Sequence, residues 1–132
     1  MTDSLRAKLT YVCATAGVTL DLSEAETDNY PYAVYDMTTN PLVDKDGVYG
    51  YMGDCKIRLV SDNVGDIDTL CATVQSAILT GMRDSDFFSK LVDITKECVD
   101  DIWTIELNYT LKQYADWAVP VEPVEQTNSD TD

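Results

Sequence analysis

The stretch WTIELNYTLK, residues 103–112, decides the fold because its side chains alternate between apolar and polar types. The apolar set is Trp103, Ile105, Leu107, Tyr109 and Leu111. Successive side chains of a strand point to opposite faces of a sheet, so this pattern predicts a strand with one buried and one solvated face.

The segment before it, from about residue 88 to residue 98, predicts a second strand. One face carries Val92, Ile94 and Cys98, and the other carries Asp93, Thr95 and Glu97. Lys96 interrupts the apolar face. Asp100 and Asp101 supply a tight connection, so we expect these two strands to form a hairpin.

Two other segments have helical periodicity. Residues 3–16 place Leu5, Leu9, Val12, Cys13 and Ala16 on one face, and Gly17 follows where a left-handed cap would end the helix. Thr2, Asp3 or Ser4 can each supply the N-cap oxygen. A second helix is expected from Asn63 to Gly81, with Asp66 as the capping-box partner. Its stripe consists of Ile67, Leu70, Cys71, Val74 and Ile78.

Between these helices the sequence predicts two more strands. Residues 32–37 are rich in aromatic and β-branched side chains, and Pro41 cannot lie within a hydrogen-bonded ladder, so the first strand should end near Thr39. Residues 55–59 alternate, with Lys56 and Arg58 facing outward. We expect a long loop over residues 40–53, with a turn at Asp46-Gly47.

The expected order is helix, strand, strand, helix, strand, strand. It predicts an α+β fold in which two helices pack on one face of a largely antiparallel four-stranded sheet. Residues 1–118 form the single domain, and residues 119–132 form an acidic tail too polar to fold. The expected core includes Leu9, Val12, Ile57, Leu59, Ile67, Leu70, Val74, Ile105 and Leu107.

Composition excludes several classes of function. The 132 residues carry a formal net charge of −15, which disfavours binding to nucleic acid or to anionic lipid. Histidine is absent, so this chain contains neither a Ser-His-Asp triad nor a His-based zinc site. No run of about 18 apolar residues predicts a membrane span, and residues 1–9 do not resemble a signal peptide.

The remaining chemical motifs are weak. Cys13, Cys55, Cys71 and Cys98 form no C-x-x-C pair and fall on apolar stripes, so we expect four buried thiols. The segment Asp44-Lys45-Asp46-Gly47 resembles part of a calcium loop, but Leu42 and Gly53 stand where its end ligands are needed. The sequence has no glycine-rich phosphate loop or nucleophile elbow. We therefore expect no catalytic residue, metal site or cofactor.

Tyrosine is distributed unevenly. Five of the eight tyrosines, Tyr30, Tyr32, Tyr35, Tyr49 and Tyr51, lie on the first strand and the loop after it. Tyrosine is enriched at protein interfaces, although ordinary strand composition and loop packing explain the cluster equally well. If the cluster marks an interface, we expect these residues to contact a neighbouring subunit or partner: Tyr35, Asp44, Asp46, Tyr49 and Tyr51.

The order of elements and five segments resemble the tail-terminator or tail-completion proteins of long-tailed bacteriophages and prophages. These segments are YPYAVY at residues 30–35, the glycine-bearing loop, KIRLV at residues 56–60, AIL at residues 77–79, and the strand at residues 103–111. The resemblance covers about residues 3–114 and lies in pattern and topology.

This resemblance implies a non-enzymatic virion protein, located at the neck of the tail and made in the host cytoplasm. It implies a homo-oligomeric ring, usually of six copies, that caps the tail tube and joins it to the head-proximal connector. DNA would pass through the ring without specific binding, which suits an acidic channel. The alternative is a stand-alone interaction module of phage or mobile-element origin.

Overall fold

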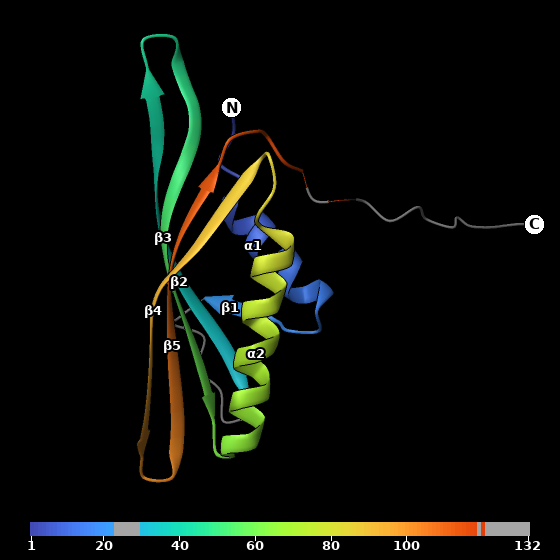
Figure 1. Cartoon of the computed structure of the whole chain (residues 1–132), viewed down its shortest axis with the longest axis vertical. Coiled ribbons are helices and arrows are strands. Elements are labelled where there is room, and N and C mark those ends of the chain that lie inside the picture. Colours follow the sequence, from blue (N-terminus) through green and yellow to red (C-terminus); the bar gives the residue numbers. More distant parts are fainter. Residues whose placement is uncertain (23–29, 119, 121–132) are drawn as a thin grey trace, which may run out of the picture.

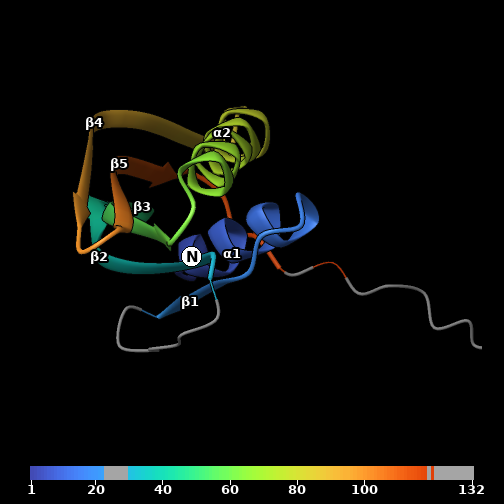
Figure 2. The same cartoon turned by 90° about the horizontal axis from the view of Figure 1, so that it is seen from below.

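A mixed five-stranded sheet runs along the long axis of the protein, and both helices lie on one of its faces (Figures 1 and 2). The computed structural model describes residues 1–22, 30–118 and 120. The elements are α1 (Leu5–Thr15), β1 (Leu20–Leu22), β2 (Tyr32–Asp44), β3 (Gly47–Ser61), α2 (Val64–Gly81), β4 (Phe87–Val99) and β5 (Ile102–Gln113). The α+β class is confirmed.

The sheet differs from the expected one in having a fifth strand. The order is β1-β2-β3-β5-β4, with β1 parallel to β2 and the other pairs antiparallel. β1 has three residues, of which only Leu20 is buried. A segment this short shows no alternation, so the sequence pattern did not reveal it.

The predicted hairpin at the C-terminal end of the domain is confirmed. β4 pairs with β5 from Phe87↔Gln113 to Val99↔Ile102, and Asp100 and Asp101 form the turn with φ values of 53° and 65°. Two consecutive positive φ values are typical of the tight turns that match the twist of a hairpin.

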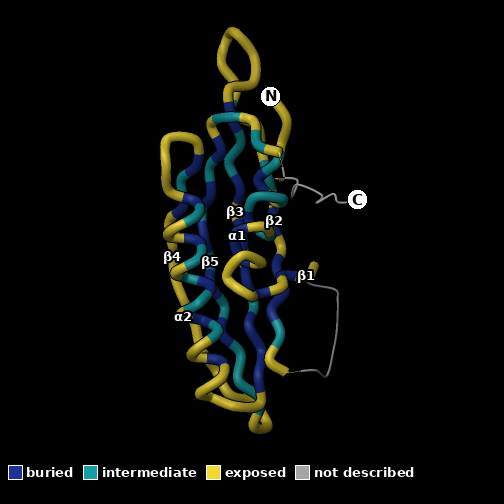
Figure 3. The backbone as a smooth tube through the Cα atoms, turned by 90° about the vertical axis from the view of Figure 1, so that its right-hand side faces the viewer, coloured by how far each residue is buried: buried dark blue, intermediate teal, exposed yellow. Residues whose placement is uncertain are grey.

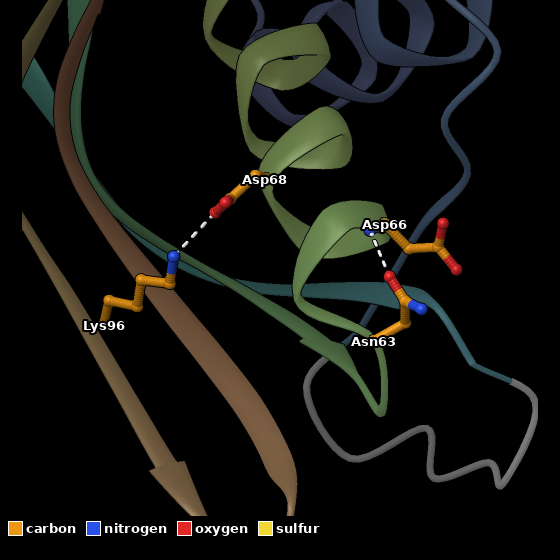
Figure 4. A network of polar contacts seen from close by, with 4 residues as sticks. All are labelled: Asn63, Asp66, Asp68 and Lys96. Atoms are coloured by element: carbon orange, nitrogen blue, oxygen red, sulfur yellow. Dashed lines mark hydrogen bonds and ion pairs between the residues drawn. The ribbon is translucent and has the colours of Figure 1, made fainter.

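A β-bulge changes the predicted faces of β4. Val92 lies between the pairs Leu91↔Tyr109 and Asp93↔Asn108, which interrupts the alternation. Lys96 is opposite Ile105, and its Nζ lies 2.8 Å from Asp68 Oδ1 of α2 and 5.2 Å from the centre of the Trp103 ring (Figure 4). Lys96 therefore interrupts the apolar pattern because it reaches toward α2.

Both helices begin and end close to the predicted residues. Asp3 Oδ1 accepts a hydrogen bond from the backbone N–H of Leu5 at 3.2 Å, and Gly17 has a φ of 88°. At α2, Asn63 Oδ1 accepts from the N–H of Asp66 at 2.9 Å (Figure 4). The N–H of Asn63 donates to Ser61 Oγ at 3.1 Å. Ser61 therefore accepts the hydrogen bond that a capping box would direct to the Asp66 carboxylate.

The core lies between the helices and the sheet, and it contains the predicted residues with one difference. Leu9, Ile57, Ile67 and Leu107 are fully buried, whereas Leu70 is only half-buried. Tyr114 and the residues after it continue along α1, where the Trp117 ring lies 5.5 Å from that of Tyr11. The predicted tail at residues 119–132 falls outside the described residues, apart from Pro120.

The prediction of four buried cysteines is wrong for one of them. Cys13, Cys55 and Cys71 are buried, but Cys98 is exposed. Cys98 lies on β4, the edge strand, most of which is exposed. Burial raises the pKa of the Cys13 and Cys55 thiols to about 12.

The predicted long loop at residues 40–53 is also wrong, because this segment continues the β2–β3 hairpin. Pro41 pairs with Tyr51, and Leu42 pairs with Gly50. Pro41 is tolerated because β1 pairs with β2 only at residues 33–35, so β2 is an edge strand at Pro41.

Candidate assembly interface

The tip of the β2–β3 hairpin projects beyond the rest of the sheet (Figure 1). Over residues 42–50, which we call the arm, β2 and β3 pair with each other and with no other strand of the part of the chain that the structure describes. With a rise of about 3.3 Å per residue, this part extends roughly 10 Å past the last residues of β5. An isolated two-stranded hairpin is at best marginally stable in water, so the arm gains from any surface that covers it.

Residues 43–49 of the arm are exposed, as the colouring of the backbone shows (Figure 3). Val43 is 61% exposed, Tyr49 is 48% exposed and Val48 is 41% exposed. At the turn, Asp44 Oδ1 accepts a hydrogen bond from the N–H of Asp46 at 2.8 Å, which fixes the two-residue connection. The arm therefore combines an ordered, acidic turn with exposed valine and tyrosine side chains.

A buried amide holds the base of the arm. Gln113, the last residue of β5, is fully buried, and its Nε2 lies 2.9 Å from both Thr2 O and Ser4 Oγ. Its Oε1 accepts a hydrogen bond from the N–H of Ser4 at 3.1 Å. Because Gln113 pairs with Tyr51, these bonds join the first residues of the chain to the point where the arm leaves the sheet.

Two further contacts brace the same point. Tyr51 Oη donates to Met1 O at 3.1 Å, and Thr39 Oγ1 donates to Asp3 Oδ2 at 2.7 Å. A side chain at Gly50 would collide with the carbonyl oxygen of Gln113. The arm is thus attached to the domain through a tightly packed base, and its direction is defined.

The structure separates the five residues predicted for an interface. Asp44, Asp46 and Tyr49 lie together on the arm, and Tyr51 lies at its base. Tyr35 is only 7% exposed, and the guanidinium of Arg6 lies 5.7 Å from the centre of its ring. Tyr35 is therefore a core residue of the isolated chain and does not belong to the candidate interface.

A second exposed surface lies on the opposite edge of the sheet, between α2 and β4. This groove has a volume of about 460 Å³ and is lined by Gln75, Leu79, Arg83, Phe88, Ser89, Lys90, Leu91 and Tyr109. Leu79 is 60% exposed, and Ile94, farther along β4, is 46% exposed. The sequence pattern does not reveal this groove, although Lys96 on the apolar face of β4 indicates that α2 covers that strand incompletely.

Basic side chains gather around Phe88, which lines this groove. The guanidinium of Arg83 lies 5.5 Å from the centre of the Phe88 ring, and Lys112 Nζ lies 5.7 Å from it. Lys90 lines the same groove. Three of the nine basic residues of the chain therefore lie at or beside this groove, and none of its described lining residues is acidic.

The described residues offer little metal chemistry. They contain no group of three or more Cys, Asp or Glu side chains placed to hold a metal ion. Neither described helix is long and apolar enough to cross a membrane. A larger hollow of about 680 Å³ separates α1 from α2, and Lys8 is the only charged residue lining it.

Comparison with solved structures shows a likeness in fold. The sequence matches no protein-family model and no curated protein. A chain in a structure described as the virion of a native gene transfer agent (GTA) particle has a similar fold, with a TM-score of 0.51 and 18% sequence identity. The similarity covers 85% of this chain and 90% of that chain. The α+β architecture is therefore shared with a virion component over nearly the whole length of both chains.

Proposed function

We propose that this protein is a structural component of a phage-like virion. In this role it forms a ring that caps the tail tube and joins it to the head-proximal connector. The observation that carries the proposal is the likeness in fold to a chain of the gene transfer agent virion, which extends over 85% of this chain. The resemblance of the sequence to tail-terminator proteins supports the specific role at the tail.

The arm supports a role in assembly. It leaves the sheet from a base held by Gln113 and Tyr51, and it exposes Val43 and Tyr49. Ordered exposed apolar groups are typical of surfaces that bind another protein. The protein in this role needs no cofactor and catalyses no reaction.

The charge of the chain suits a ring through which DNA passes. An acidic wall repels the phosphates of DNA, so the duplex slides without adhering. Asp62, Asp66, Asp68, Asp100 and Asp101 lie around the start of α2 and the β4–β5 turn, at the end of the molecule opposite the arm. We propose that this acidic end contributes to the channel wall.

Native mass spectrometry and electron microscopy of the purified full chain test the proposal. We expect a closed oligomer, alone or after addition of tail tubes, and density for the ring at the neck of complete particles. A chain that stays monomeric at every concentration and does not bind tube ends contradicts the ring. That result would favour a stand-alone interaction module. Neighbouring genes for capsid, connector and tail-tube proteins would separate the two classes independently.

A further inference from the structure

We propose that the arm of one copy docks into the groove between α2 and β4 of the next copy. This contact is the joint from which the proposed ring is built, so the inference rests on the proposed function. It commits to one occupant, residues 42–50 of a second copy of this chain.

The position of the two surfaces favours a repeating contact. The arm projects from the end of the sheet at the β2–β3 turn, whereas the groove lies beside the edge strand β4. Because the two surfaces lie on different parts of the chain, the arm of one copy can occupy the groove of a neighbouring copy. Such a head-to-tail contact uses two different patches and closes into a ring when the rotation between copies permits it.

The chemistry of the two surfaces is complementary. The arm carries Asp44 and Asp46 on either side of Lys45, so its turn has a net negative charge. Arg83 and Lys90 line the groove. Lys90 and Lys112 alternate with the core-facing Ser89 and Leu111, so their charges lie at the β4 rim of the groove, toward the sheet face opposite α2. The charged residues among the described lining of the groove are all basic, although the chain has 24 acidic and 9 basic residues. Opposite charges across an interface steer association and set its register.

The apolar parts of the two surfaces also match. Val43, Val48 and Tyr49 are exposed on the arm, and Leu79 and Leu91 line the groove. Covering these side chains removes apolar surface from water on both copies at once. The apolar pairs supply affinity, and the charged groups orient the turn.

The acidic residues closest in sequence to the lining of the groove are Asp84 and Asp86, and their charges offset part of its positive potential. Asp84 and Asp86 lie in the connection between α2 and β4. Asp84 Oδ1 accepts hydrogen bonds from the N–H groups of Asp86 at 2.7 Å and Phe87 at 2.9 Å. The Asp84 carboxylate is therefore committed to shaping the connection.

A charge exchange tests the contact in the full chain. Asp46→Lys changes the net charge from −15 to −13, so general repulsion between copies falls. The docking contact nevertheless predicts weaker assembly, by at least about tenfold in the association constant, because the turn then meets Arg83 and Lys90. Asp62→Lys makes the same change in net charge at the other end of the molecule and serves as the matched control, with assembly unchanged or stronger.

Reversing the charges of the groove provides the second half of this test. Arg83→Glu with Lys90→Glu should also weaken assembly, and combining it with Asp46→Lys should restore most of the loss. Restoration supports the contact, since two independent defects do not repair each other. Equal assembly by Asp46→Lys and Asp62→Lys overturns it.

Disulfide trapping gives a second, geometric test. In a Cys98→Ser background, Asp46→Cys combined with Lys90→Cys should yield a ladder of covalent multimers under oxidation, ending at the number of copies in the ring. Asp62→Cys with Lys90→Cys is the control and should yield no ladder. Rings that form without cross-linking at residues 46 and 90 overturn the docking contact and leave the proposed ring intact. Absence of any assembly by the unmodified chain overturns both.

Discussion

Cysteine reactivity depends on where each side chain lies relative to the helices. Cys13 and Cys55 are buried, and their thiols have pKa values raised to about 12 by loss of solvation. Burial also raises the pKa of Cys71. Because the thiolate is the reactive form, these three side chains are protected both by packing and by protonation near neutral pH.

We therefore predict that one thiol per folded chain is labelled rapidly by a maleimide at pH 7.5. Mass spectrometry should place the label on Cys98, and Cys98→Ser should remove the fast phase. Unfolding in denaturant should expose all four thiols. Rapid labelling of Cys13 or Cys55 in the folded chain would contradict the burial described above.

Gln113 is the residue whose role the sequence reveals least. Its position continues the alternation of β5, where an apolar side chain would be expected, yet its amide joins Thr2 and Ser4 to the base of the arm. A buried amide is tolerated only when its polar atoms are hydrogen-bonded.

We predict that Gln113→Leu lowers the free energy of unfolding by about 1–3 kcal/mol, because the N–H of Ser4 and the oxygens of Thr2 and Ser4 lose their partner. Urea denaturation measures the change. Ser4→Ala combined with Gln113→Leu should cost less than the sum of the two single changes, since both act on one network. Strict additivity would show that the bonds are independent.

At the scale of elements, leucine side chains of α2 and β5 differ widely in burial. Leu107 of β5 is fully buried beneath the helices, Leu70 of α2 is half-buried, and Leu79 near the end of α2 is 60% exposed. Helical spacing alone does not distinguish Leu70 from Val74. The distinction depends on how much of α2 the sheet covers.

We predict that Leu107→Ala lowers the free energy of unfolding by about 2–5 kcal/mol, as expected for a buried leucine. Leu70→Ala should cost clearly less, and Leu79→Ser should change stability by no more than about 0.5 kcal/mol. Chemical denaturation of the three variants measures how far each substitution lowers the free energy of unfolding. A cost at Leu79 as large as that at Leu107 would mean that the groove is closed in the isolated chain.

Shortening the arm tests its proposed role in assembly with little expected effect on the stability of the domain. Leu42 and Gly50 already face each other, so replacing residues 43–49 with Asn-Gly leaves a two-residue hairpin turn. The replacement removes two acidic residues and one lysine, which changes the net charge by only one unit.

We predict that this shortened chain keeps its melting temperature within a few degrees of the original and no longer assembles. Circular dichroism during heating and light scattering across concentration measure the two properties. The base of the arm, with Gln113 and Tyr51, is retained, so a large loss of stability is not expected. A shortened chain that still forms rings or completes tails would show that the arm is not the interface.

At the scale of the whole molecule, the proposed assembly works against charge. Every copy carries −15, so copies repel one another over distances comparable with the Debye length, which is about 10 Å at 0.1 M salt. The contact between arm and groove is short-range and partly apolar, so salt screens it less than it screens the long-range repulsion.

We predict that the assembled fraction rises as sodium chloride increases from about 20 mM to about 200 mM, where screening of distant charges is greatest. Sedimentation velocity at fixed protein concentration measures this fraction. Assembly that weakens steadily over that range would indicate that direct ion pairs dominate the interface.

The sequence by itself determined the parts of the structure that repeat locally. Alternation over residues 103–111 defined β5, the spacing of Ile67, Val74 and Ile78 defined α2, and Asp100-Asp101 marked the β4–β5 turn. These features follow from the period of a strand or a helix and from turn chemistry. They require no knowledge of which element lies beside which.

Only the tertiary structure decided the features that depend on neighbouring elements. Pro41 indicated a loop, but it lies in a hairpin because β1 leaves that part of β2 at an edge. Tyr35 is buried and Cys98 exposed because the sheet extends beyond the cover of the helices on one side and not on the other. The arm and the groove exist for the same physical reason: strands and helices of unequal extent leave backbone edges and apolar side chains that no other described residues cover.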